Sequence, residues 1–355
     1  MSTPTQPMPE PGAPVITEEE ISLEQKEVAG LSQGQIVRRR FLQHRAAMVS
    51  LIVLALTLLL AITSIGWGPV PGWWKWNAYD VVGSPSGQRP TLAFLGIGGH
   101  FFAWGDFPFG ASGQWGTDNF AQVMRGTQQT IVVVLILGLL TTVIGVVLGA
   151  VAGFFLGWVD SVIMRFTDLI ITLPIILITA VVGYQFNTRG VLVVALALGL
   201  LSWTSLARLV RAEFLSLRER EFVDAARVAG ASNARIMFKH ILPNSVGVIV
   251  VNVTLTMSGG ILAEAALSYL QFGIQYPDVS LGSLISQYQG SIQTGEPYLF
   301  IWPGVMIIVI VLCLNFIGDG LRDAFDPRQK RIPKARDLRK SRQLEAMATA
   351  AGPES

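Results

Sequence analysis

The chain has 355 residues, of which 51% are hydrophobic and only 14% are charged, and its mean hydropathy is +0.51. Soluble domains carry roughly 25% charged residues, so this composition excludes a globular protein whose whole surface faces water. The net charge of +2 does not indicate a nucleic-acid partner, and a single cysteine, Cys313, excludes both an intramolecular disulfide and a cysteine-based metal site.

Residues 1–45 are polar and proline-rich, and they are predicted to form a cytoplasmic N-terminal segment. This segment is much longer than the charged region that opens a signal peptide. We therefore expect no cleavable signal, and membrane insertion through an uncleaved span.

Six apolar stretches are long enough, or nearly so, to cross the hydrocarbon core, which takes about 20 residues. They are residues 46–66, 131–155, 162–184, 191–207, 245–270 and 299–317. They predict an all-α polytopic membrane protein with about six transmembrane helices. Pro174 lies in the third stretch and is predicted to kink it, because proline removes one backbone donor and clashes with the preceding turn.

The distribution of Lys and Arg predicts the orientation. With the N-terminus inside, 22 of the 26 Lys and Arg residues face the cytoplasm, and only Lys75, Arg89, Arg125 and Arg189 lie outside. This bias follows the positive-inside rule. The chain is therefore expected in the plasma or inner membrane, with both termini in the cytoplasm. Residues 320–355 are expected to form a basic cytoplasmic tail.

Residues 67–127 are predicted to form a long extracytoplasmic loop. Its tryptophans fit two interpretations, an interfacial belt at the lipid headgroups or contact with substrate. They are Trp67, Trp73, Trp74, Trp76, Trp104 and Trp115.

Gly145, Gly149 and Gly153 repeat every four residues and share one helix face. Such a face lets another helix approach closely in lipid, either within the chain or across a subunit interface. Asp160, Arg165 and Asp168 are predicted to form a local ion-pair cluster before the third span.

Glu264 lies inside the fifth span. A carboxylate there must face protein or water. Its two interpretations are a structural partner for a backbone or hydroxyl group, and a substrate contact.

The loop between spans four and five is the most distinctive segment. Residues 221–229 favour a helix, with acidic residues early and Arg227 late. Gly230 is predicted to end this helix in a left-handed conformation, and Ser232 to cap a second short helix that ends at His240. Pro243 is predicted to mark re-entry into the membrane. The loop is thus expected to form a hairpin with small residues on one face, suited to a partner's groove or to anionic lipid.

Asp224-Ala225-Ala226, Gly230 and Leu242-Pro243 match the EAA loop of importer permeases of the ATP-binding-cassette (ABC) class. The stretches Glu264-Ala-Ala-Leu-Ser-Tyr-Leu-Gln-Phe-Gly273 and Gly318-Asp-Gly-Leu-Arg-Asp-Ala-Phe-Asp-Pro327 resemble signatures of the dipeptide, oligopeptide and nickel branch. The chain therefore resembles the second permease subunit of dipeptide and oligopeptide importers. Asp224 replaces the usual Glu, Gln271 replaces a usual Gly, and Gly116-Thr117-Asp118 lacks the Gly-Arg-Asp element that normally follows it.

This resemblance implies a type I ABC importer permease fold over residues 128–319, with a coupling loop at 221–243 that contacts an ATPase. It further implies a second homologous permease subunit, two ATP-binding-cassette ATPase domains and an extracytoplasmic substrate-binding protein. The chain itself has no Gly-x-x-x-x-Gly-Lys-Ser/Thr loop. We expect it to bind no cofactor or metal and to have no catalytic residue.

Three alternatives remain open from sequence. The first is a permease of the same class that carries nickel or another small solute in place of peptides. An ion-coupled secondary carrier would need paired intramembrane carboxylates or inverted repeats, and only Glu264 is present. An intramembrane enzyme would need a catalytic motif such as Gly-x-Ser-x-Gly or His-Glu-x-x-His, and the sequence has neither.

Overall fold

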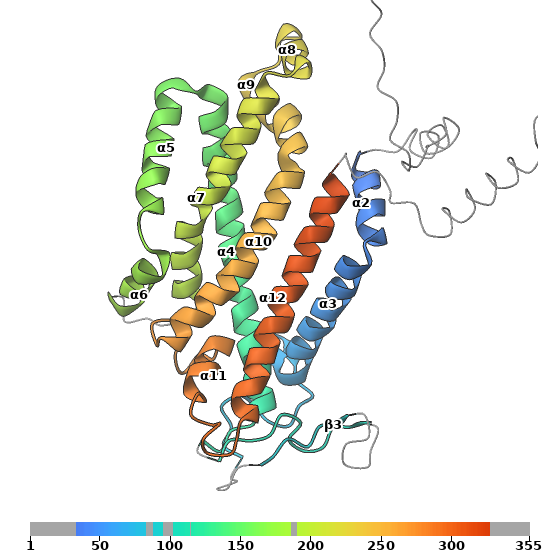
Figure 1. Cartoon of the computed structure of the whole chain (residues 1–355), viewed down its shortest axis with the longest axis vertical. Coiled ribbons are helices and arrows are strands. Elements are labelled where there is room, and N and C mark those ends of the chain that lie inside the picture. Colours follow the sequence, from blue (N-terminus) through green and yellow to red (C-terminus); the bar gives the residue numbers. More distant parts are fainter. Residues whose placement is uncertain (1–32, 83–87, 95–101, 114, 186–189, 327–355) are drawn as a thin grey trace, which may run out of the picture.

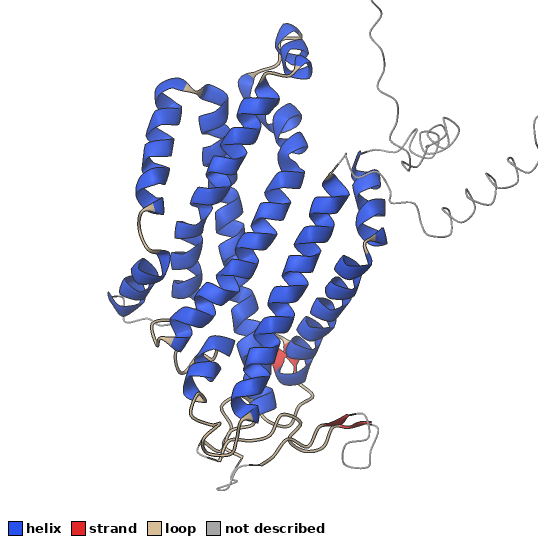
Figure 2. Ribbon diagram, in the orientation of Figure 1, coloured by secondary structure: helices blue, strands red, loops and turns tan. Residues whose placement is uncertain are grey.

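The computed structural model describes residues 33–82, 88–94, 102–113, 115–185 and 190–326. It is a bundle of long helices, with α8 at one end and the short strands at the other (Figures 1 and 2). We call these the α8 end and the strand end. The predicted N-terminal segment up to residue 32 and the tail from residue 327 lie outside the described residues.

Five described helices are long and apolar enough to cross a membrane. Four are α3 (Arg45–Ile65), α4 (Asn119–Phe155), α7 (Val191–Arg218) and α12 (Tyr298–Phe325). The fifth, Asn233–Tyr269, joins the three-residue α9 (Asn233–Arg235) and a π-helical segment to α10 (Leu242–Tyr269).

The third predicted span is a bent pair, α5 (Gly157–Ile171) and α6 (Ile175–Gln185), whose axes differ by 78°. With this pair counted as one span the total is six, which confirms the predicted number of spans. Pro174 lies at the break, as expected, but the change of direction is far larger than a kink within one helix.

Several boundaries differ from those predicted. Helix α4 starts inside the stretch 67–127 that was expected to be loop, because the Asp118 side chain caps it by accepting a hydrogen bond from the Ala121 amide. At the α8 end, α12 continues past residue 319 to Phe325. The predicted polar N-terminal segment contains a helix, α2 (Gln33–Gln43), which precedes α3.

The strand end is a folded cap that includes two antiparallel hairpins. One joins β1 (Gly66–Trp67) to β2 (Val70–Pro71), and the other joins β3 (Ala93–Phe94) to β4 (Phe102–Ala103). A short helix, α11 (Leu281–Gln287), lies at the same end of the bundle (Figure 1). The expected external loop is therefore an ordered structure in its described parts.

Aromatic side chains hold this cap together. Trp74 and Trp104 pack edge-to-face on Phe120, and Phe109 stacks on Trp302. Trp74 and Trp104 are partly buried and pack against the apolar cluster of the cap, so they have a structural role beside the two interpretations that the sequence leaves open.

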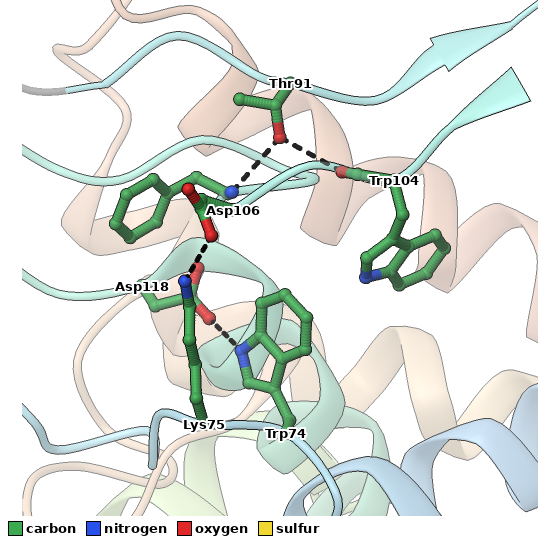
Figure 3. Close-up of polar contacts among 7 residues, drawn as sticks. Trp74, Lys75, Thr91, Trp104, Asp106 and Asp118 are labelled. Carbon is green, nitrogen blue, oxygen red and sulfur yellow. Dashed lines mark hydrogen bonds and ion pairs between the residues drawn. The ribbon is translucent and has the colours of Figure 1, made fainter.

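Polar contacts add to the cap (Figure 3). Trp74 Nε1 donates to Asp118 Oδ2 at 2.6 Å, so the residue that caps α4 also anchors the loop. Lys75 pairs with Asp106, and the Thr91 hydroxyl links the Trp104 carbonyl to the Phe107 amide.

Candidate coupling site

The predicted coupling loop is built on a short helix that follows α7 after a two-residue turn. This helix, α8 (Glu221–Val228), carries Glu221 and Asp224 in its first turn and Arg227 in its last. Those charges complement the helix dipole. Gly230 follows with φ +78°, a conformation that disfavours any side chain. The Ala231 amide then donates back to the Ala226 carbonyl at 3.0 Å, which closes the turn.

Ser232 caps the next helix, accepting from the Arg235 amide at 3.4 Å. That helix does not stop at His240 as expected. It continues through a π-helical segment, η1 (Ile236–Ile241), directly into α10. Pro243 therefore lies in the first turn of α10 but inside a continuous helical run, so its missing N–H removes one backbone hydrogen bond to the preceding turn. The chain enters the membrane span without a break after Ser232.

The side-chain amide of Asn244 donates to the His240 carbonyl at 2.7 Å, and the Ser245 hydroxyl donates to the Ile241 carbonyl. These bonds supply partners to carbonyl groups at the junction between η1 and α10. Single-turn π segments occur frequently at functional sites.

One face of α8 is fixed to the bundle. Val223 is fully buried, and Ala226 packs partly buried against the same apolar cluster as Ile236, Met237 and Phe214. Leu242 also packs against this cluster. The expected small-residue face is thus divided, with Ala226 turned inward and Ala225 exposed.

The opposite face of α8 is exposed and mixed in character, with Val228 beside the charged Glu221 and Asp224. Val228 is 90% exposed, and Phe222 and Phe238 also lie on the surface. Asp224 and Gly230 are exposed as well, and Asp224 pairs with Arg227 at 2.9 Å within the helix. The loop therefore presents exposed apolar side chains among charged ones, on a helix whose other face is buried against the bundle. Sequence reasoning named the alanines but missed Val228, which stands beside them in the same helix.

The predicted glycine face of α4 packs within the chain. A Cβ at Gly149 would stand 2.5 Å from the Ala207 carbonyl oxygen, and one at Gly153 would stand 2.7 Å from that of Arg211. Gly145 lies against the Leu206 side chain. All three neighbours belong to α7, so the glycines bring α4 and α7 together.

Glu264 is fully buried near the strand end of α10. Ser268 donates to one carboxyl oxygen at 2.7 Å and Thr130 of α4 to the other at 3.4 Å. The Ser268 hydroxyl also accepts from the Ile274 amide. Glu264 thus partners hydroxyl groups, as its structural interpretation expects, and the bonds link α4, α10 and the turn that follows α10.

The expected local cluster of Asp160, Arg165 and Asp168 is not formed. Both carboxylates instead pair with α7, Asp160 with Arg211 and Asp168 with Arg208. These pairs could not be predicted from the sequence, because the paired residues are far apart in the chain and α5 and α7 meet only in the folded bundle.

The C-terminal signature packs α12 onto its neighbours. A Cβ at Gly320 would stand 2.3 Å from the Ala47 side chain, and one at Gly318 would stand 2.7 Å from the Thr254 hydroxyl. Asp323 pairs with His44 at 3.3 Å. These contacts give the signature a packing role where α12 meets α3, α10 and the residue between α2 and α3.

Within the described residues, no group of three or more His, Cys, Asp or Glu side chains could hold a metal ion.

Comparison with known proteins agrees with this architecture. Residues 145–331 match the family of the "Binding-protein-dependent transport system inner membrane component", and residues 32–77 match the "N-terminal TM domain of oligopeptide transport permease C". The chain belongs to this family of inner membrane components, the permease subunits of ABC importers. It is a multi-pass membrane transport protein, and ATP hydrolysis belongs to separate subunits.

Within the family the chain is an OppC-like permease. It is 35% identical over 303 residues to the oligopeptide transport system permease protein OppC of Mycobacterium tuberculosis, covering 85% of this chain and 97% of that protein. It is 32% identical over 326 residues to OppC of Haemophilus influenzae, covering 92% and 98%. A solved structure of the MetNI methionine ABC transporter in inward facing conformations aligns with a TM-score of 0.48 at 19% identity, covering 58% of this chain and 96% of that chain.

Proposed function

We propose that the chain forms half of the translocation pore of an ATP-driven importer of di- or oligopeptides. The match of residues 32–77 to the N-terminal domain of oligopeptide permease C and the names of the relatives support the peptide class. Residues 128–319 would form the permease domain, with both termini in the cytoplasm.

The observation that carries the mechanism is the exposed apolar surface of α8. Val228 is almost fully exposed, while Val223 on the opposite face is fully buried. A helix that is anchored on one face and presents exposed apolar and charged side chains on the other suits docking into a groove of a partner protein. The ATPase subunit is that partner, and Asp224, Ala225, Ala226, Gly230, Leu242 and Pro243 shape and position the contact.

The complete importer would contain a second homologous permease, two ATPase domains and an extracytoplasmic binding protein, set in the lipid bilayer. Nucleotide binding closes the ATPases and draws the two α8 helices together. The attached spans then switch the pore, between the two permeases and lined by spans three to five, from one access state to the other. Because both sites bias one two-state element, the coupling is reciprocal.

A substitution at the tip of α8 tests this assignment. In proteoliposomes with all partners, Val228→Asp should abolish peptide uptake and the stimulation of ATP hydrolysis by the binding protein. Membrane insertion should be unchanged, because this side chain is 90% exposed. Val228→Thr, similar in shape, is the matched control and should retain most of the activity. Normal uptake by Val228→Asp would contradict the docking assignment.

A further inference from the structure

Three arginines of α7 point toward the α4–α5 side of the bundle. They stand at positions 208, 211 and 218, which share one face of a helix with 3.6 residues per turn. Arg208 and Arg211 pair with carboxylates of α5, and Arg218 donates to the Phe154 carbonyl at the end of α4. This face therefore fastens α7 to the end of α4 and to α5, which is the first half of the bent third span.

The link between Arg211 and Asp160 has the strongest geometry. Arg211 Nε lies 2.5 Å from Asp160 Oδ1, and a terminal guanidinium nitrogen lies 2.6 Å from Oδ2. Two parallel bonds of this kind fix orientation as well as distance. The Asp160 side chain is only 15% exposed, so solvent screens this pair less than a surface pair.

Helix α5 buries few of its side chains within the described chain. Thr167 is its only fully buried residue, whereas α4 buries a long series of side chains. Val162 and Leu169 are more than half exposed, and Phe166 stacks on Trp203 of α7. Two ion pairs and one pair of stacked rings thus join α5 to α7.

Helix α7 is also the element that leads into α8. Only Glu219 and Arg220 separate the two helices, and α8 packs on the same apolar cluster as the buried Phe214 of α7. A displacement of α8 therefore acts on this end of α7, where Arg211 holds α5, as well as on η1. Beyond α5 the chain bends by 78° into α6.

We propose that Asp160 and Arg211 are positioning residues that make α5 move with α7, so that a displacement of α8 reaches the bent third span. Asp168 and Arg208 form a second, more exposed link of the same kind. This role rests on the proposed function, since it requires α8 to be moved by an ATPase. Loss of the link leaves α8 docked and the ATPases active, but it weakens the connection between hydrolysis and transport.

The test compares peptide molecules imported with ATP molecules hydrolysed in proteoliposomes that contain the complete importer. Arg211→Gln and Asp160→Asn should each lower this ratio about tenfold, within the range typical of coupling between sites. Binding-protein-stimulated hydrolysis should persist. The exchanged pair Asp160→Arg with Arg211→Asp should recover much of the ratio, which a general loss of packing would not allow. The control is Lys75→Gln, which removes an exposed ion pair in the cap.

A parental ratio in both Arg211→Gln and Asp160→Asn would overturn the inference. So would an exchanged pair that keeps the parental melting temperature but recovers nothing. If the exchanged pair does not fold, the decision rests on Asp160→Asn, which preserves shape and one acceptor. Val228→Asp, measured in parallel, separates the two proposals. Full activity of that variant contradicts the docking of α8, whereas its inactivity beside a fully coupled Arg211→Gln contradicts only the positioning role.

Discussion

Gly149 of α4 lies directly against the backbone of Ala207 in α7, so that a Cβ at position 149 would stand 2.5 Å from the Ala207 carbonyl oxygen. No side chain can occupy that space unless one helix moves. The two helices form the most extensive helix contact in the described part of the chain, and α7 leads into α8. The glycine face of α4 therefore sets the position of α7, and of the α8 helix that follows it, relative to α4.

Gly149→Ala should destabilise the permease, because overpacking of a tight interface costs about 1–3 kcal/mol. The melting temperature of the purified protein in detergent measures this. Gly304→Ala is the control, since an added Cβ at position 304 of α12 meets nothing within 4 Å. Equal melting temperatures for parent and Gly149→Ala would show that α4 and α7 are not packed as described.

Glu264 is predicted to stabilise the fold without contacting the peptide. Glu264→Ala leaves the Ser268 and Thr130 hydroxyls without their acceptor, and each buried unpaired group costs about 1–3 kcal/mol. Glu264→Gln keeps one acceptor oxygen and should be milder. Thermal unfolding and the KM for peptide uptake check this together. A raised KM in a Glu264→Gln protein of parental stability would instead identify a substrate contact.

The buried carboxyl of Asp118 should make the stability of the cap depend on pH. Burial raises the pKa of this carboxyl above its ordinary value of 3.8, and the hydrogen bond from Trp74 opposes that shift. The folded state thus keeps the proton to higher pH than the unfolded chain does. The free energy of unfolding should therefore fall as pH rises from about 3.8 through the raised pKa, and then level off.

Asp118→Asn should remove that part of the pH dependence, because asparagine also caps helices and its carbonyl oxygen can accept from Trp74. Asp118→Ala should lose about 0.5–2 kcal/mol of capping energy at every pH. Melting temperatures of the three proteins across the acidic range decide the matter. Parallel pH curves for parent and Asp118→Asn would contradict the assignment to this carboxyl.

The spans could be predicted because lipid imposes a strong local rule, a run of apolar residues long enough to cross. The left-handed Gly230 and the cap at Ser232 were equally local, since both depend on a residue's own conformational preference. Pro174 marked the break in the third span for the same reason. A proline marks a break without fixing the angle across it, so the 78° between α5 and α6 is visible only in the structure.

The rest depends on contacts between residues far apart in the chain. Trp74 meets Asp118 across the cap, and Tyr288 donates to Gln122 at 2.8 Å between α4 and the end of α11. Neither pair leaves a periodic signal in one sequence. The junction of η1 with α10 likewise escaped notice, because Pro243 resembles a helix boundary until Asn244 is seen to bond back to the His240 carbonyl.

The most direct test of the central claim is uptake of a labelled oligopeptide into proteoliposomes that contain the permease pair and the ATPase subunits, with the binding protein outside. Uptake should require ATP at the ATPase side, should be lost when the ATPase subunits are omitted, and should be unaffected when ion gradients are collapsed. Uptake driven by an ion gradient through the permeases alone would contradict the account.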